Sequence, residues 1–154
     1  MILELIASMA LVQDFQDQPS DAERQVFAAC LEANPDDAAC IGSVSSPCME
    51  EPGGDTTIGM IACTSRELRL WDDKLNLHYG DLRAVLRLKD ATNRREALLT
   101  AQRAWIAYRD AECAQSSLLF EGGTLARVVH IGCVNQMTAE RAIQLENQLF
   151  ESRM

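Results

Sequence analysis

The sequence predicts an all-α protein, an antiparallel bundle of three long helices preceded by an N-terminal helix and an irregular segment stapled by disulfides. Three observations support this. Aromatic residues are only 5% of the 154 residues, so the core must be built mainly from aliphatic side chains. Apolar residues recur at spacings of three and four over long stretches, which is typical of amphipathic helices. The six cysteines form no CxxC pair and are even in number, which favours a disulfide framework.

The first predicted helix spans residues 20–34. Ser20 followed by Glu23 forms a capping box, and the Asn34-Pro35 pair ends the helix.

Residues 1–12 are apolar like the centre of a signal peptide, but no basic residue precedes them and Glu4 interrupts them. We therefore expect residues 1–19 to be a partial signal or a flexible segment, and residues 1–12 are too few to cross a membrane.

Residues 20–62 form an acidic, cysteine-rich region. Residues 1–62 hold eleven Asp and Glu residues and one Arg, so they carry a charge of −10. The whole chain carries −9, so residues 63–154 carry a charge of only +1. This charge disfavours nucleic acid and anionic membranes as partners and favours cationic proteins. Residues 35–62 are rich in Pro and Gly, and we expect an irregular loop there.

Residues 63–154 are expected to form a helical domain. Thr64 with Glu67 reads as a second capping box, and a helix over 64–89 follows from one apolar stripe. A second helix over 94–120 ends at Gly122 and Gly123, since glycines commonly follow a helix end. Thr124 begins the third helix, for which one continuous helix is preferred over a fresh start at Thr138. The stripe of the first of these helices is Leu68, Trp71, Leu75, Tyr79, Leu82 and Leu86.

The spacing of Cys113 and Cys133 supports a helical hairpin. Both lie ten residues from Gly123, and residues equidistant from a turn lie side by side in antiparallel helices. A Cys113–Cys133 bridge is therefore predicted. The other four cysteines allow three pairings, of which the local one, Cys30–Cys40 with Cys48–Cys63, is favoured; the rival is Cys30–Cys63 with Cys40–Cys48.

The stretch AQRAWIAYRDAEC at residues 101–113 holds several reactive side chains, yet it does not predict catalysis. Asp110 and Glu112 are two apart on a helix and point in different directions, and the adjacent Arg109 and Asp110 are expected to diverge. We interpret Trp105 and Arg109 as a packing ridge, with the guanidinium reaching a carboxylate or a carbonyl group. The alternative is an exposed Trp–Arg contact for a protein partner.

Other candidate sites are also interpreted as structural or surface residues. Asn76 is expected to donate to a neighbouring helix or to join a buried polar network with Arg109 or Arg141. Asp72 and Asp73 are read as surface charges, because their spacing from His78 is wrong for metal ligands on one helix face. Gly122 and Gly123 lack the pattern of a phosphate-binding loop. No catalytic residue, metal or cofactor is therefore predicted.

Several motifs occur in an order that is similar to a known family. They are WDDKLNLHY at 71–79, AQRAWIAYRDAEC at 101–113, EGGT at 121–124, Cys133 and MTAERAIQL at 137–145. Over about residues 63–150 the chain resembles the LprI-type lysozyme-inhibitor domain of bacterial envelopes. The resemblance implies an exported, helical, disulfide-linked domain that binds and inhibits c-type lysozyme.

We therefore expect a periplasmic or secreted binding protein that is not an enzyme and that blocks a basic lysozyme or a similar glycan hydrolase. The contacts are expected in the acidic region, because an acidic face steers a cationic enzyme toward it. Two alternatives stay open: a structural or assembly protein of the envelope, and an enzyme with its site in the N-terminal region. The candidate contact residues are Asp36, Asp37, Glu50, Glu51 and Asp55.

Overall fold

The computed structural model describes residues 18–154, so the prediction for residues 1–19 lies almost wholly outside the described residues. Within that range there is no strand, and the all-α prediction is confirmed. The elements are, in order, α2 (Asp21–Ala33), the 3-10 helix η1 (Asp37–Cys40), α3 (Ser45–Glu50), α4 (Thr57–Leu88), α5 (Thr92–Ser117), the 3-10 helix η2 (Leu118–Phe120) and α6 (Leu125–Arg153).

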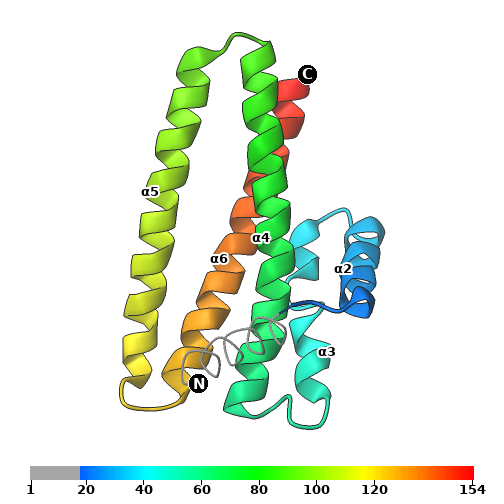
Figure 1. The fold of residues 1–154 in the computed structure, drawn as a ribbon, viewed down its shortest axis with the longest axis vertical. Helices are drawn as coiled ribbons and strands as arrows, with labels where there is room; N and C mark the ends of the chain where they lie inside the picture. The colour runs from blue at the N-terminus through cyan, green and yellow to red at the C-terminus, as the bar shows by residue number, and fades with distance from the viewer. Residues whose placement is uncertain (1–17) are drawn as a thin grey trace, which may run out of the picture.

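The three long helices α4, α5 and α6 run up, down and up in an elongated antiparallel bundle (Figure 1). α4 joins α5 at one end through a short connection, and α5 joins α6 at the other end through η2 and a turn. α6 packs along most of α4, whereas α5 packs mainly on α6. The short elements α2, η1 and α3 lie along the side of α4 (Figure 1).

α4 begins seven residues before the predicted start at residue 64. The Thr56 side chain accepts a hydrogen bond from the Gly59 backbone N–H at 3.0 Å and caps this helix. Thr64 lies buried inside α4, where its hydroxyl donates to the Met60 carbonyl at 2.8 Å. The predicted capping box at Thr64 and Glu67 is therefore wrong, because the carboxylate of Glu67 serves another helix.

Glu67 is fully buried and caps the short helix α3 from a distance in the sequence. Its Oε2 accepts hydrogen bonds from the N–H groups of Val44 (3.1 Å) and Ser45 (2.8 Å), and its Oε1 accepts one from Gly42 (2.8 Å). The Asn135 amide on α6 donates to Oε1 at 2.9 Å. Residues 35–62, which were expected to form an irregular loop, are partly helical, because they contain η1, α3 and the first residues of α4.

One hydrophobic core joins the N-terminal elements to the bundle. Phe27 on α2 packs edge-to-face against the fully buried Trp71 on α4, with ring centroids 4.8 Å apart. Cys40 and Val44 belong to the same core. The bundle contributes Leu70, Leu75, Leu82, Leu86, Leu98, Ala139, Ala142, Leu145 and Leu149.

The α5–α6 connection follows the prediction closely. α5 ends three residues early at Ser117 because η2 takes up the last predicted turn. Gly122 has a φ of 81°, a left-handed conformation that glycine adopts without strain, and the chain reverses there. α6 is continuous through Thr138, so the preference for one helix is confirmed.

Three disulfides link neighbouring elements. Cys113–Cys133 joins α5 to α6 with a Cα–Cα distance of 5.4 Å, as the symmetric spacing about Gly123 predicted. Cys30–Cys40 joins α2 to η1, and Cys48–Cys63 joins α3 to α4. The favoured local pairing is confirmed, and the rival pairing is wrong.

In the described part of the chain, no helix combines the length and the hydropathy needed to span a membrane.

Candidate functional site

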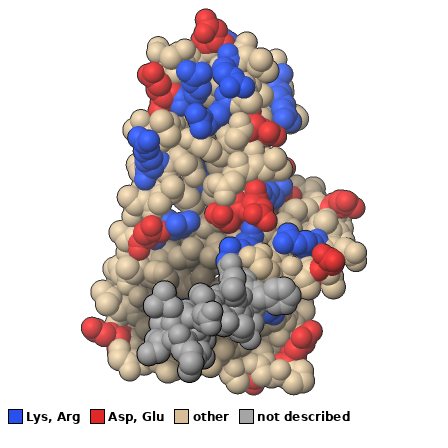
Figure 2. Space-filling model, in the orientation of Figure 1, with Lys and Arg blue, Asp and Glu red and all other residues tan. Residues whose placement is uncertain are grey.

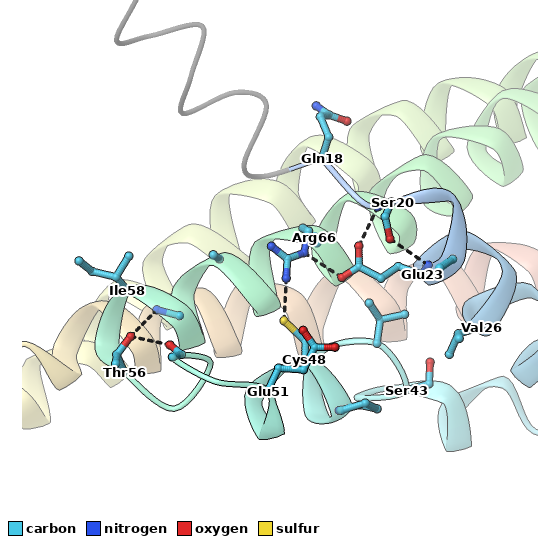
Figure 3. Close-up of a pocket in the computed structure, with 16 residues that line it drawn as sticks. Gln18, Ser20, Glu23, Val26, Ser43, Cys48, Glu51, Thr56, Ile58 and Arg66 are labelled. Carbon is cyan, nitrogen blue, oxygen red and sulfur yellow. Dashed lines mark hydrogen bonds and ion pairs between the residues drawn. The ribbon is translucent and has the colours of Figure 1, made fainter.

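A groove of about 820 Å³ lies between α2, α3 and the beginning of α4 (Figure 3). Two apolar side chains on it are well exposed, Ile58 at 81% and Val26 at 49%. Apolar side chains held in solvent beside a concave surface are typical of a protein contact site. Ser20, Glu23, Ser43, Glu51, Thr56 and Arg66 supply the polar part of the lining.

Local sequence signals position the two walls of this groove. The capping box of α2 is present as predicted, with the Ser20 N–H donating to Glu23 Oε2 at 2.7 Å and the Glu23 N–H to Ser20 Oγ at 3.2 Å. On the opposite wall, the Cys48–Cys63 disulfide holds α3 against α4. Gly59 lets the chain fold back closely, because a Cβ there would lie 2.0 Å from the Gly53 carbonyl oxygen.

An ion pair connects the two walls. The Arg66 Nε donates to Glu23 Oε1 at 2.8 Å, and the Arg66 Nη2 lies 2.6 Å from Cys48 Sγ (Figure 3). Burial acts to raise the pKa of Glu23, but hydrogen bonds from Ser20 and the Arg66 guanidinium outweigh it and leave this pKa below its ordinary value. Glu23 is therefore ionised at neutral pH and fixed in place.

Three of the five predicted contact carboxylates lie at or near the groove. Glu51 lines it, Glu50 is the last residue of α3, and Asp55 lies in the turn before α4; all three are exposed. The other two lie elsewhere. Asp36 caps η1 by accepting from the Ala38 N–H at 3.0 Å, and Asp37 is half-buried in an ion pair.

That ion pair belongs to a charged cluster that sequence reasoning missed. The Lys74 Nζ lies 3.2 Å from Asp37 Oδ2 and 3.0 Å from Glu146 Oε2, so one ammonium joins η1 to α6. His78 Nε2 lies 3.6 Å from Glu146 Oε1, and neither ring nitrogen has a hydrogen-bond partner among residues 18–154. Lys74 and His78 are one turn apart on α4, but no pattern in the sequence connects them to Asp37 or Glu146.

The cluster shifts the pKa values of its members. Burial raises the pKa of Asp37, with the neighbouring Glu146 adding to the rise and Lys74 opposing it. Burial also acts to raise the pKa of Glu146, but hydrogen bonds with Lys74 and Asp37 bring it below its ordinary value. Burial, followed by the charge of Lys74, lowers the pKa of His78, so this imidazole is neutral at pH 7.

Two guanidinium groups lie close to the ring of Trp105. Arg109 and Arg141 stack on its ring, with Cζ-to-centroid distances of 5.1 and 5.9 Å. Arg109 bonds the Asp110 carboxylate at 2.8 Å, so the expected divergence of these neighbours is wrong: a long, flexible arginine side chain can turn back to its neighbour. Trp105 is half-buried against the core, which supports the packing ridge.

The polar network expected around Asn76 does not form with either arginine. The Asn76 amide instead donates to Asp72 Oδ2 at 2.9 Å, because side chains four residues apart are neighbours on one face of α4. Arg141 is only 8% exposed and donates from Nε to Gln102 Oε1 at 2.9 Å. Within residues 18–154 no group of three or more His, Cys, Asp or Glu side chains is arranged to hold a metal ion.

The fold and this site define a class of protein: a disulfide-linked helical bundle with a partly apolar groove that has acidic residues beside it. The family model described as lysozyme inhibitor LprI matches residues 48–145, and the chain belongs to this family. An uncharacterized protein of Rhizobium meliloti (strain 1021) is similar, with 32% identity over 102 residues that cover 58% of this chain and 70% of the relative. No solved structure matches.

The family match begins earlier than the motifs indicated. It starts at residue 48 and not near residue 63, so it includes both cysteines of the Cys48–Cys63 bridge. One wall of the groove, formed by the end of α3 and the beginning of α4, lies inside the match. The other wall, formed by α2, lies outside it.

Proposed function

We propose that this protein binds a basic c-type lysozyme or a similar glycan hydrolase and blocks its cleft, and that it does so through the groove between α2, α3 and α4. The main support for this proposal is that the apolar side chains of Val26 and Ile58 are exposed on the groove. The carboxylates of Glu50, Glu51 and Asp55 lie on the groove or near it, and the chain belongs to the LprI family. Apolar groups at the centre of a contact supply affinity, and surrounding charges supply steering.

The charge distribution supports a cationic partner. The net negative charge of the chain is concentrated in its N-terminal part, where the groove lies, because residues 1–62 contain a single basic residue and residues 63–154 contain the other 13. Electrostatic attraction of this kind raises the rate of association and weakens as salt is added. The same acidic field favours a basic hydrolase over an acidic one.

We further propose that the protein acts in the periplasm or outside the cell. Three disulfides pair all six cysteines, and disulfides persist in oxidising compartments.

We propose binding and not catalysis as the activity of this groove. The half-buried ion pair between Glu23 and Arg66 holds these two side chains together, and the depressed pKa of Glu23 makes this carboxylate a poor general acid at neutral pH. The sixteen lining residues include no histidine, and the sulfur of Cys48 is part of a disulfide.

The test is a lysozyme lysis assay with three forms of the protein. Wild-type protein in excess is expected to slow the lysis of bacterial cells by a c-type lysozyme. The triple variant E50Q/E51Q/D55N is expected to inhibit at least about tenfold less well at low salt, because three steering charges are removed. Ile58→Ser is expected to weaken inhibition at every salt concentration, since its contact is apolar.

A matched control separates local charge from net charge. The variant E96Q/E140Q/E151Q also removes three exposed carboxylates, all from α5 and α6. It is expected to inhibit like the wild type. Absence of inhibition by excess wild-type protein would overturn the lysozyme proposal and favour the structural or assembly role in the envelope; equal losses in both triple variants would overturn the assignment to the groove.

A further inference from the structure

A second, smaller cleft lies at the other end of α4, where this helix meets α5. Its volume is about 360 Å³, and it is lined by Gly80, Arg83, Ala84 and Arg87 of α4 and by Arg95 of α5. The four α4 residues recur at spacings of three and four and so share one helix face. Gly80 and Ala84 leave room between the arginines; a Cβ added at Gly80 would meet nothing within 4 Å.

The cleft gathers positive charge on an acidic protein. Residues 80–103 contain six Lys and Arg residues and three Asp and Glu residues, whereas the chain as a whole carries −9. Figure 2 shows Lys and Arg side chains gathered, with a few Asp and Glu side chains beside them, at the end of the bundle where α4 and α5 join. Along α4 the cleft lies about 30 Å from the acidic groove, taking 1.5 Å of rise per residue.

The arginines of the cleft have few internal partners. Arg83 stacks on the Tyr79 ring at 5.6 Å. Arg87 and Arg95 form no ion pair or hydrogen bond with any side chain in residues 18–154, although Arg95 is half-buried. A half-buried guanidinium without an anionic partner has lost part of its hydration with no compensating contact.

We propose that this cleft binds a phosphate-bearing anion. Guanidinium groups bind phosphate oxygens through paired, charge-assisted hydrogen bonds, and three of them around one cavity match a multivalent anion. No carboxylate lines the cleft to compete for them. The phosphate group is the chemistry that the cleft recognises, carried either by a free anion or by the headgroup of an anionic lipid.

The test uses the full chain with two probes. Inorganic pyrophosphate is titrated at low salt by calorimetry, and saturable binding at one site is expected. The variant R83Q/R87Q is expected to weaken this binding by at least about tenfold, because each charged hydrogen bond lost weakens binding substantially. Both arginines are exposed, so the variant is expected to keep the wild-type circular dichroism spectrum.

The control variant R24Q/R127Q removes the same charge from exposed positions on α2 and α6 and is expected to bind pyrophosphate like the wild type. Co-sedimentation with vesicles of phosphatidylglycerol or of phosphatidylcholine distinguishes the sources. If the protein associates with phosphatidylglycerol vesicles but not with phosphatidylcholine vesicles, and R83Q/R87Q associates less, the ligand is a lipid headgroup. If pyrophosphate binds and neither kind of vesicle does, the ligand is a free anion. If neither probe binds, or if both variants weaken binding equally, the cleft is not a phosphate site.

Discussion

Glu67 joins the N-terminal region to the bundle through hydrogen bonds of its buried carboxylate. Its carboxylate accepts three backbone N–H groups around the start of α3 and one side-chain amide from α6. α3 has only six residues and no side-chain cap of its own, so this carboxylate satisfies donors that would otherwise be buried without partners. One buried side chain therefore holds α3 against both α4 and α6.

Glu67→Gln tests this role. The amide replaces one oxygen with an NH₂ group that faces N–H donors, so the variant is expected to lower the free energy of unfolding by about 3 kcal/mol. Equilibrium unfolding in urea measures the change. Glu140→Gln alters an exposed glutamate on α6 and is expected to change stability by less than about 0.5 kcal/mol. Equal midpoints for both variants would refute the capping role.

At the scale of elements, the Cys113–Cys133 bridge holds the α5–α6 hairpin. α5 makes little contact with α4, so its position depends mainly on α6 and on this crosslink. The bridge spans 20 residues and includes the turn at Gly122. It restricts the unfolded chain and also fixes the register of the two helices.

Removal of this bridge in C113A/C133A is expected to lower the free energy of unfolding by about 3 kcal/mol, from the entropy of the closed loop. Hydrogen exchange is the more specific measurement, since amides of α5 are expected to exchange faster while those of α4 change little. C30A/C40A removes a bridge between α2 and η1 and is expected to leave exchange in α5 unchanged. Faster α5 exchange in both variants would contradict a local role.

Across the whole molecule, a shared hydrophobic core and a half-buried charge cluster join the N-terminal elements to the bundle. Phe27 packs on Trp71, and Lys74 joins Asp37 on η1 to Glu146 on α6. His78 lies in the same cluster with its pKa lowered by burial and by Lys74, while Glu146, Asp81 and Asp37 oppose the shift. The unfolded state therefore binds a proton at His78 more readily than the folded state.

This difference sets the sign of a pH dependence. A lowered histidine pKa contributes stability that is present above the ordinary value of 6.5 and is lost as the pH falls toward the folded-state pKa. The free energy of unfolding of the wild type is thus expected to fall below about pH 6.5, and that of His78→Asn to fall less steeply.

Urea unfolding over a pH series measures both proteins. In a second arm, Lys74→Met removes the nearby positive charge and is expected to raise the pKa of His78, as followed by NMR titration. Parallel pH profiles for the wild type and His78→Asn would show that this imidazole does not couple to folding.

Much of the architecture could be predicted because its signals are local. Helical periodicity, the Ser20–Glu23 capping box and the glycine turn each act within a few residues, and the symmetric spacing of Cys113 and Cys133 needs only one helical hairpin. The prediction that the working surface lies in the acidic region stays a prediction, with Glu51 on the groove and Asp37 inside the charged cluster.

The all-α class, the order of the long helices and the Cys113–Cys133 bridge could be predicted from the chain alone, because helical periodicity and the spacing of cysteines about a turn are local features. Three contacts depend on how the helices pack: Glu67 caps α3, Lys74 joins Asp37 to Glu146, and Arg95 faces the arginines of α4. These contacts join residues up to 109 positions apart, since Asp37 and Glu146 share one ammonium. A polar side chain has the same local pattern whether it caps a helix, pairs in the core or lines a cleft, so the packing of the helices selects its role.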